Sequence, residues 1–123
     1  MHAEMDYHEV NSIGTIQISP QVIEMIAKLT AEEVEGVYRL SGGFAHEFVD
    51  FLGRNKASTK GIRSQVGQKE VAVDISIIIQ YGRIFLSVAK VLQEQIKNAI
   101  ENMTNLTVVE VNVHIDGIHY EDK

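Results

Sequence analysis

The sequence predicts an α+β domain of two layers, with one mixed or antiparallel sheet of about four strands and helices on one face of it. In Val71–Gln80 every second residue is apolar and branched, namely Val71, Val73, Ile75, Ile77 and Ile79. Val108–Asp116 repeats the alternation with Val109, Val111, Val113 and Ile115 on the apolar side, and Val108 is an exception on the polar side. Such alternation is typical of strands with one buried and one wet face, so helices should cover a single side of the sheet.

The first half of the chain predicts a strand, a helix and a short extended segment. Ile13–Ile18 is a predicted strand. Ser19 and Pro20 mark a helix start, because serine caps free N–H groups and proline suits the first helical position. Apolar residues then recur at helical spacing until Gly36, which ends the helix. Val37–Leu40 follows as an extended segment.

The second half predicts a short helix, two strands joined by a tight turn, a long helix and a last strand. The predicted elements are a helix within Phe44–Leu52, a loop over Gly53–Lys60, a strand over Gly61–Val66, its hairpin partner Val71–Tyr81, a helix from Phe85 to about Met103 and the strand Val108–Asp116. Gly82 breaks the hairpin partner before the long helix, and Gly117 closes the last strand.

Length and composition indicate one domain. Of the 123 residues, 1–12 are predicted to be a flexible N-terminal tail, 13–118 the domain and 119–123 a C-terminal tail. The chain has no cysteine, which excludes disulfides and thiolate metal sites. No run approaches the roughly 18 apolar residues of a membrane span, and the acidic N-terminus lacks the features of a secretory signal. We therefore expect a cytoplasmic protein that reaches a membrane only through a partner.

Charge is distributed unevenly along the chain. The net charge is −6, which argues against general nucleic-acid binding. The segment 54–69 nevertheless contains basic residues and no acidic one, the basic residues being Arg54, Lys56, Lys60, Arg63 and Lys69. This segment either contacts phosphates, acidic headgroups or an acidic protein, or is a solvated loop and strand edge. No aromatic side chain is available in it to stack on bases.

Metal and catalytic patterns are weak. His114, Asp116 and His119 lie close in sequence, but Gly117 interrupts their spacing and a zinc site needs three or four converging ligands. A further set of possible ligands in the N-terminal tail comprises His2, Glu4, Asp6 and His8. We expect exposed polar side chains on the sheet in the first case and a disordered acidic tail in the second, with no metal and no cofactor.

Two other patterns suggest catalysis only superficially. Ser41-Gly42-Gly43 precedes a predicted helix but lacks the Lys and Ser/Thr of a phosphate-binding loop. Asp74 and Glu110 could pair as carboxylates on neighbouring strands, yet an open sheet face does not supply the dry pocket that acid–base catalysis requires. The chain is therefore not expected to be an enzyme.

Four strings occur together and in this order: GTIQIS (Gly14–Ser19), EVEGV (Glu33–Val37), GQKEVAVD (Gly67–Asp74) and VEVNVHIDG (Val109–Gly117). Over about Ile13–Ile118 the chain thereby resembles the alkaline shock protein family of Gram-positive bacteria. One departure is Phe85-Leu86, where members often have Ile-Pro before the long helix.

The resemblance implies a small cytoplasmic protein of envelope stress and homeostasis, without catalytic residues or cofactor. It also implies self-association or a membrane-anchoring partner and, in one branch, a link to acetyl-CoA carboxylase and fatty-acid synthesis. We therefore expect a non-enzymatic interaction module; the alternative is a nucleic-acid-binding regulator using segment 54–69. The candidate partner-binding residues are Arg54, Lys56, Lys60, Arg63, Asp74, Glu110 and His114.

Overall fold

One long strand, β5 (Glu70–Gln80), organises the main sheet of the computed structural model, which describes residues 7–42 and 61–121. The other elements of these ranges are β1 (Tyr7–Val10), β2 (Thr15–Ile18), α1 (Pro20–Glu32), β3 (Val37–Leu40), β4 (Ile62–Val66), α3 (Phe85–Thr104) and β6 (Thr107–His119). β6 pairs with β5 in parallel, whereas β3 and β4 pair with it antiparallel. In the described part of the chain this is a four-stranded mixed sheet, which confirms the predicted α+β class.

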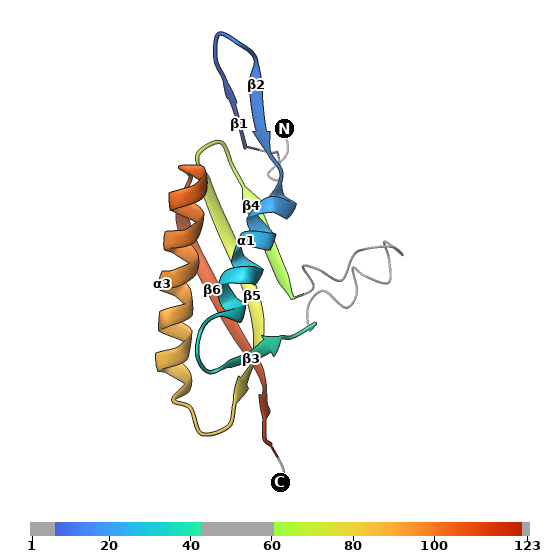
Figure 1. The fold of residues 1–123 in the computed structure, drawn as a ribbon, viewed down its shortest axis with the longest axis vertical. Helices are drawn as coiled ribbons and strands as arrows, with labels where there is room; N and C mark the ends of the chain where they lie inside the picture. Colours follow the sequence, from blue (N-terminus) through green and yellow to red (C-terminus); the bar gives the residue numbers. More distant parts are fainter. Residues whose placement is uncertain (1–6, 43–60, 122–123) are drawn as a thin grey trace.

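β3 and β4 lie end to end along the same edge of β5 (Figure 1). Their junction is at Ser76, whose carbonyl accepts a hydrogen bond from the Ser41 N–H at 2.8 Å and whose N–H donates to the Gly61 carbonyl at 2.9 Å. Gly61 has a φ of +92°, and a Cβ there would collide with the Ser41 carbonyl oxygen. The junction therefore requires glycine, because only glycine combines this backbone conformation with so close an approach.

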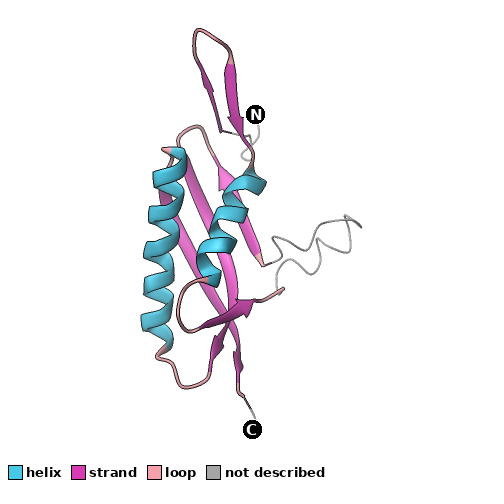
Figure 2. Ribbon diagram, in the orientation of Figure 1, coloured by secondary structure: helices cyan, strands magenta, loops and turns pink. Residues whose placement is uncertain are grey.

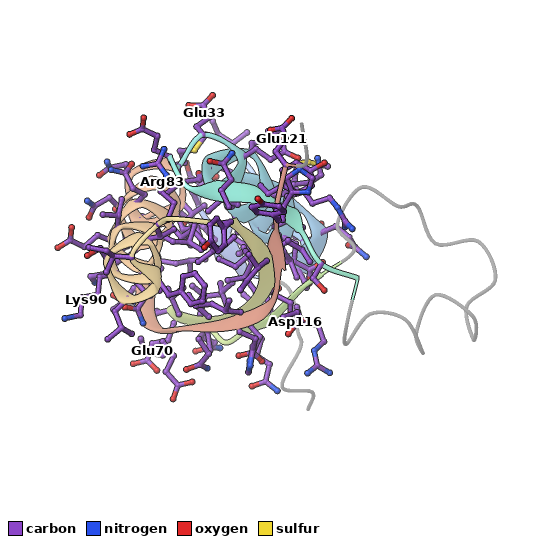
Figure 3. The ribbon with its side chains drawn as sticks, turned by 90° about the horizontal axis from the view of Figure 1, so that it is seen from below. Glu33, Glu70, Arg83, Lys90, Asp116 and Glu121 are labelled. Atoms are coloured by element: carbon purple, nitrogen blue, oxygen red, sulfur yellow. The ribbon has the colours of Figure 1, made fainter. Side chains whose placement is uncertain are left out.

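Both described helices cover one face of the sheet (Figure 2). The apolar side of β5 faces them, and Val73, Ile75, Ile77 and Ile79 are completely buried. The helices contribute the matching stripes Ile23, Ala27 and Ala31 from α1 and Val88, Leu92, Ile96 and Ile100 from α3. In a view along the long axis of the molecule, the labelled charged side chains lie at the periphery, and other side chains fill the space beside α3 (Figure 3). The period-two prediction for β5 is confirmed.

The face assignment predicted for the start of the last strand is wrong. Val108 is buried, with 5% of its surface exposed, whereas Val109 is 52% exposed. A bulge explains the inversion: Val71 pairs with Val108, but the next residue of β5, Ala72, pairs with Glu110. One extra residue in β6 reverses the alternation locally.

Two side chains of α3 bond to the backbone of β6. Gln93 Nε2 donates to the Val111 carbonyl at 2.9 Å. Glu101 Oε2 accepts hydrogen bonds from the Val108 N–H and from Lys97 Nζ, both at 2.8 Å. The Lys97 contact and the Val108 N–H lower the pKa of Glu101 below its ordinary value of 4.5. These bonds connect the long helix directly to the bulged end of β6.

The N-terminal strands form a hairpin that projects from one end of the main sheet (Figure 1). The Asn11 side chain organises its turn, since Oδ1 accepts the N–H groups of Ile13 at 2.8 Å and Gly14 at 3.0 Å. Residues 7–10 were expected in a flexible tail and instead form β1. Their polar composition obscured a strand that is specified by this turn.

Other predicted boundaries differ in detail. Ser19 is the N-cap of α1, but its hydroxyl makes no capping hydrogen bond within the described residues. α3 begins at Phe85, as predicted, and ends before Asn105, which has a left-handed φ of 67°. β6 continues past Gly117 to His119, beyond the predicted closure at Gly117. The helix predicted within Phe44–Leu52 and the loop Gly53–Lys60 lie outside the described residues.

Candidate interaction surface on the open face of the sheet

The sheet side opposite α1 and α3, here called the open face, brings together four of the predicted partner-binding residues. Arg63 pairs with Asp74, Ala72 with Glu110, and Ser76 with His114 across neighbouring strands. Asp74 lies between two completely buried residues of β5, so strand alternation directs it away from the core. Directly paired residues on one face have Cβ atoms roughly 5 Å apart, and this places Arg63, Asp74, Glu110 and His114 on one continuous surface.

Asn112 connects the two carboxylates of the open face. Its Nδ2 donates to Asp74 Oδ1 at 2.9 Å and to Glu110 Oε1 at 3.2 Å. The Asn112 side-chain amide therefore bridges the two carboxylates. In the row Asp74–Asn112–Glu110 these hydrogen bonds hold both carboxylates in position at the surface. This differs from the directly paired carboxylates considered from the sequence, because an Asn side chain supplies the two donors that they share.

A second polar contact links the residue that follows β3 to β6, across β5. Ser41 Oγ donates to Asp116 Oδ2 at 2.7 Å, although these residues are 75 positions apart. Asp116 lies at a second bulge of β6, between the pairs Ile77–Ile115 and Ile78–Gly117. Ser76, expected on a wet face, is only 1% exposed. The open face is thus less accessible here than beside Asp74.

Sequence reasoning considered Ser41 only as part of a glycine turn and missed this contact. Gly117 within an alternating strand was a usable signal, because an isolated glycine in a strand often marks a bulge. The Ser41 N–H is bonded to the Ser76 carbonyl, so it is not available as an anion donor. Residues 43–60 lie outside the described ranges.

The basic segment is described only in part. Arg54, Lys56 and Lys60 lie outside the described residues, and their role in partner binding stays a prediction. Arg63 is exposed on β4 and belongs to the open face.

The possible metal ligands of β6 do not converge, whereas His2, Glu4 and Asp6 of the N-terminal set lie outside the described residues. His114 and Asp116 are exposed on β6, whereas the His119 ring stacks on Tyr38 with centroids 3.8 Å apart and planes 3° from parallel. Across the described residues no group of three or more His, Cys, Asp or Glu side chains is arranged to hold a metal ion. That the protein needs no metal stays a prediction.

Sequence reasoning also missed an aromatic groove at the end of the sheet where β5 and β6 finish. The groove has a volume of about 430 Å³ and is lined by Tyr38, Gln80, Tyr81, His119, Tyr120 and Glu121. Tyr81 and Tyr120 meet edge to face, with centroids 5.0 Å apart and planes at 87°. Residues 119–123 are predicted to be a tail, so this convergence is not visible in the sequence.

Comparison with known proteins gives a match over nearly the whole chain. The model of the alkaline shock protein 23 family, described as having a cell envelope-related function, matches residues 8–120. The "uncharacterized protein YqhY" of Bacillus subtilis (strain 168) is 34% identical over 116 residues, covering 94% of this chain and 85% of that protein. A "stress response regulator gls24 homolog" of Streptococcus pyogenes is 32% identical over 114 residues, covering 89% of this chain.

This chain spans 62% of the length of the gls24 homologue. Among solved structures, the manganese form of a glutamate-to-aspartate variant of the MamM CTD overlaps with a TM-score of 0.48 at 13% identity, covering 79% of this chain and 96% of that one. Neither helix in ranges 7–42 and 61–121 has the length and apolar character needed to cross a bilayer.

Proposed function

Because this chain belongs to the alkaline shock protein 23 family, whose function is related to the cell envelope, we propose that it is a non-enzymatic interaction module in envelope stress and homeostasis. The open face of the sheet is its partner-binding surface. The residues that contact the partner are Arg63, Asp74, Glu110, Asn112 and His114.

The row Asp74–Asn112–Glu110 is the observation that supports this proposal. The Asn112 amide holds both carboxylates in place at an exposed surface, so little side-chain freedom is lost when a partner binds them. Carboxylate oxygens retain lone pairs for lysine or arginine side chains of a partner, and hydrogen bonds to charged groups are the strong ones. Catalysis would instead require a water-excluded site with a poised acid or base.

The partner proposed here is a cytoplasmic protein that presents basic side chains to Asp74 and Glu110 and acidic side chains to Arg63 and the basic segment. An acetyl-CoA carboxylase subunit and a membrane-anchoring protein are the two candidates implied by the family resemblance. The chain acts in the cytoplasm and reaches the membrane through such a partner. Nucleic acid fits the open face poorly, because Asp74 and Glu110 would repel phosphates.

Affinity capture from native cells tests this proposal. The double variant Asp74→Asn, Glu110→Gln removes two charges from the open face while keeping side-chain size. The matched control Glu33→Gln, Glu94→Gln removes two charges from exposed positions on the helical side. Quantitative mass spectrometry should show that partners captured by the wild type and the control are reduced about fivefold or more with the open-face variant, as expected when two charge-assisted contacts are weakened.

Capture of the same partners in equal amounts by both variants would place the contact elsewhere on the molecule. Capture with and without detergent distinguishes a soluble enzyme from a membrane anchor, because only the anchor depends on solubilising the membrane.

A further inference from the structure

The aromatic groove is built by three segments that are far apart in the sequence. Tyr38 comes from β3, Gln80 and Tyr81 from the end of β5, and the remaining lining residues from the end of β6 and just after it. Three of the four tyrosines of the chain therefore meet at one place. Backbone hydrogen bonds fix these segments: the Gln80 N–H donates to the Gly36 carbonyl and the Tyr81 N–H to the His119 carbonyl, both at 2.9 Å.

The aromatic rings that line the groove have different orientations. Tyr81 and Tyr120 stand nearly perpendicular to each other, while Tyr38 and His119 form a parallel stack. Tyr38, Tyr81 and Tyr120 are 44%, 66% and 64% exposed, so much of their aromatic surface is in contact with water. Within the described residues, the packing of the core does not account for this exposed aromatic surface.

The charge of the groove selects among ligand types. Glu121 is acidic, and neither lysine nor arginine lines the groove in the part of the chain that is described. Aromatic faces attract cations through the ring quadrupole, and the carboxylate adds to that attraction. A primary ammonium carries three N–H donors and a guanidinium five, so each gives up more hydration on leaving water for ring faces than a quaternary ammonium does. A quaternary ammonium has no N–H and is satisfied by ring faces and one carboxylate.

We propose that this groove is a binding site for a small organic cation with a quaternary ammonium group. The volume of about 430 Å³ is at the lower end of the range usual for small-molecule sites, roughly 300–1,000 Å³. Exposed ring surfaces of Tyr38, Tyr81 and Tyr120 contact the methyl groups, and Glu121 balances the charge. This site is separate from the Asp74–Asn112–Glu110 row and does not depend on the partner proposed above.

Titration of the full chain with choline tests the site. The protein contains no tryptophan, so intrinsic tyrosine fluorescence reports mainly on the three groove tyrosines. Choline should give a saturable change at constant ionic strength. The neutral tert-butyl analogue of choline has the same shape without the charge, and it should bind at least about fivefold more weakly if cation–π attraction dominates.

Substitutions at Tyr81 distinguish the loss of an aromatic ring from a loss of folded structure. Tyr81→Leu removes an exposed ring and should weaken choline binding about three- to tenfold, whereas Tyr81→Phe keeps the ring and should bind like the wild type. Amide chemical shifts follow binding in these variants, and circular dichroism confirms that each is folded. Absence of saturable choline binding to the wild type overturns the proposal, as does equal affinity for choline and its neutral analogue. Equal affinity for ethanolamine overturns the assignment to quaternary ammonium compounds.

Discussion

Replacing Ile75 by aspartate tests the assignment of the two faces of the sheet most directly. Ile75 is completely buried and pairs with Ile62 on one side and Val113 on the other. Truncating a buried isoleucine to alanine costs about 2–5 kcal/mol. Aspartate adds an uncompensated buried carboxylate, which costs several kcal/mol more or forces protonation. The total is comparable to the whole stability of a domain, about 5–15 kcal/mol.

Urea unfolding followed by far-ultraviolet circular dichroism measures these effects. Ile75→Asp should be largely unfolded without denaturant, and Ile75→Ala should unfold cooperatively at a lower urea midpoint. Asp74→Asn changes the adjacent residue of the same strand but lies on the open face, so we expect a loss of about 1 kcal/mol or less, the usual value of one hydrogen bond. Equal destabilisation by Asp74→Asn and Ile75→Asp, or a native-like Ile75→Asp variant, would refute the assignment of faces.

Four further predictions concern other parts of the chain. Gly61→Ala should destabilise the domain by about 2 kcal/mol or more. Gly82 has a similar φ but open space where a methyl group would be added, so Gly82→Ala should cost only about 1–2 kcal/mol of backbone strain. The urea midpoints of the two variants measure this difference. The pKa of Glu101 is lowered in the folded state. The ionised Glu101 therefore stabilises the fold fully above its ordinary pKa of 4.5, and this stabilisation is lost as the pH falls through the lowered pKa of the folded state. The melting-temperature difference between wild type and Glu101→Gln should therefore shrink below about pH 4.5. His114→Ala should leave the melting temperature unchanged with or without added zinc, whereas stoichiometric zinc lost on this substitution would contradict a metal-free protein. Charge reversal in the basic segment should slow partner association and weaken its salt dependence in surface plasmon resonance, without altering the fold, and a variant that associates at the wild-type rate would identify a solvated loop; the reversed residues are Arg54, Lys56 and Lys60.

The central strand and the helices were predictable because their signals are local and periodic. In β5 every second residue from Val71 to Ile79 is buried, and the bounds of α3 follow from Gly82 and the apolar stripe. Alternation in β6 was equally clear, yet the faces of Val108 and Val109 were inverted. A bulge changes pairing by one residue without changing composition, so a sequence pattern alone does not locate it.

For the open face and the aromatic groove, the sequence predicts at most which single residues are exposed, and not the contacts between them. Asp74, Glu110 and His114 were correctly placed away from the core, because each follows from the alternation of its own strand. The Asn112–Asp74 hydrogen bond, the Ser41–Asp116 hydrogen bond and the Tyr38–His119 stack each join segments that are far apart in the sequence. These contacts depend on register and on which strands are neighbours, and neither quantity is encoded in local periodicity.

The end-to-end placement of β3 and β4 on β5 has a consequence for the order of folding. β4 and β5 are joined by a short turn at Gly67–Lys69, so this hairpin closes with little loss of chain entropy, whereas β3 must close a much longer loop to reach the other half of the same edge. We expect hydrogen exchange to reflect this division, with backbone amides of β5 opposite β4 opening less often than those opposite β3. The aromatic groove needs β3 in place, so it would form late in folding and open first in the native state. A ligand bound there would consequently slow exchange in that half of the sheet and leave the β4–β5 hairpin unchanged.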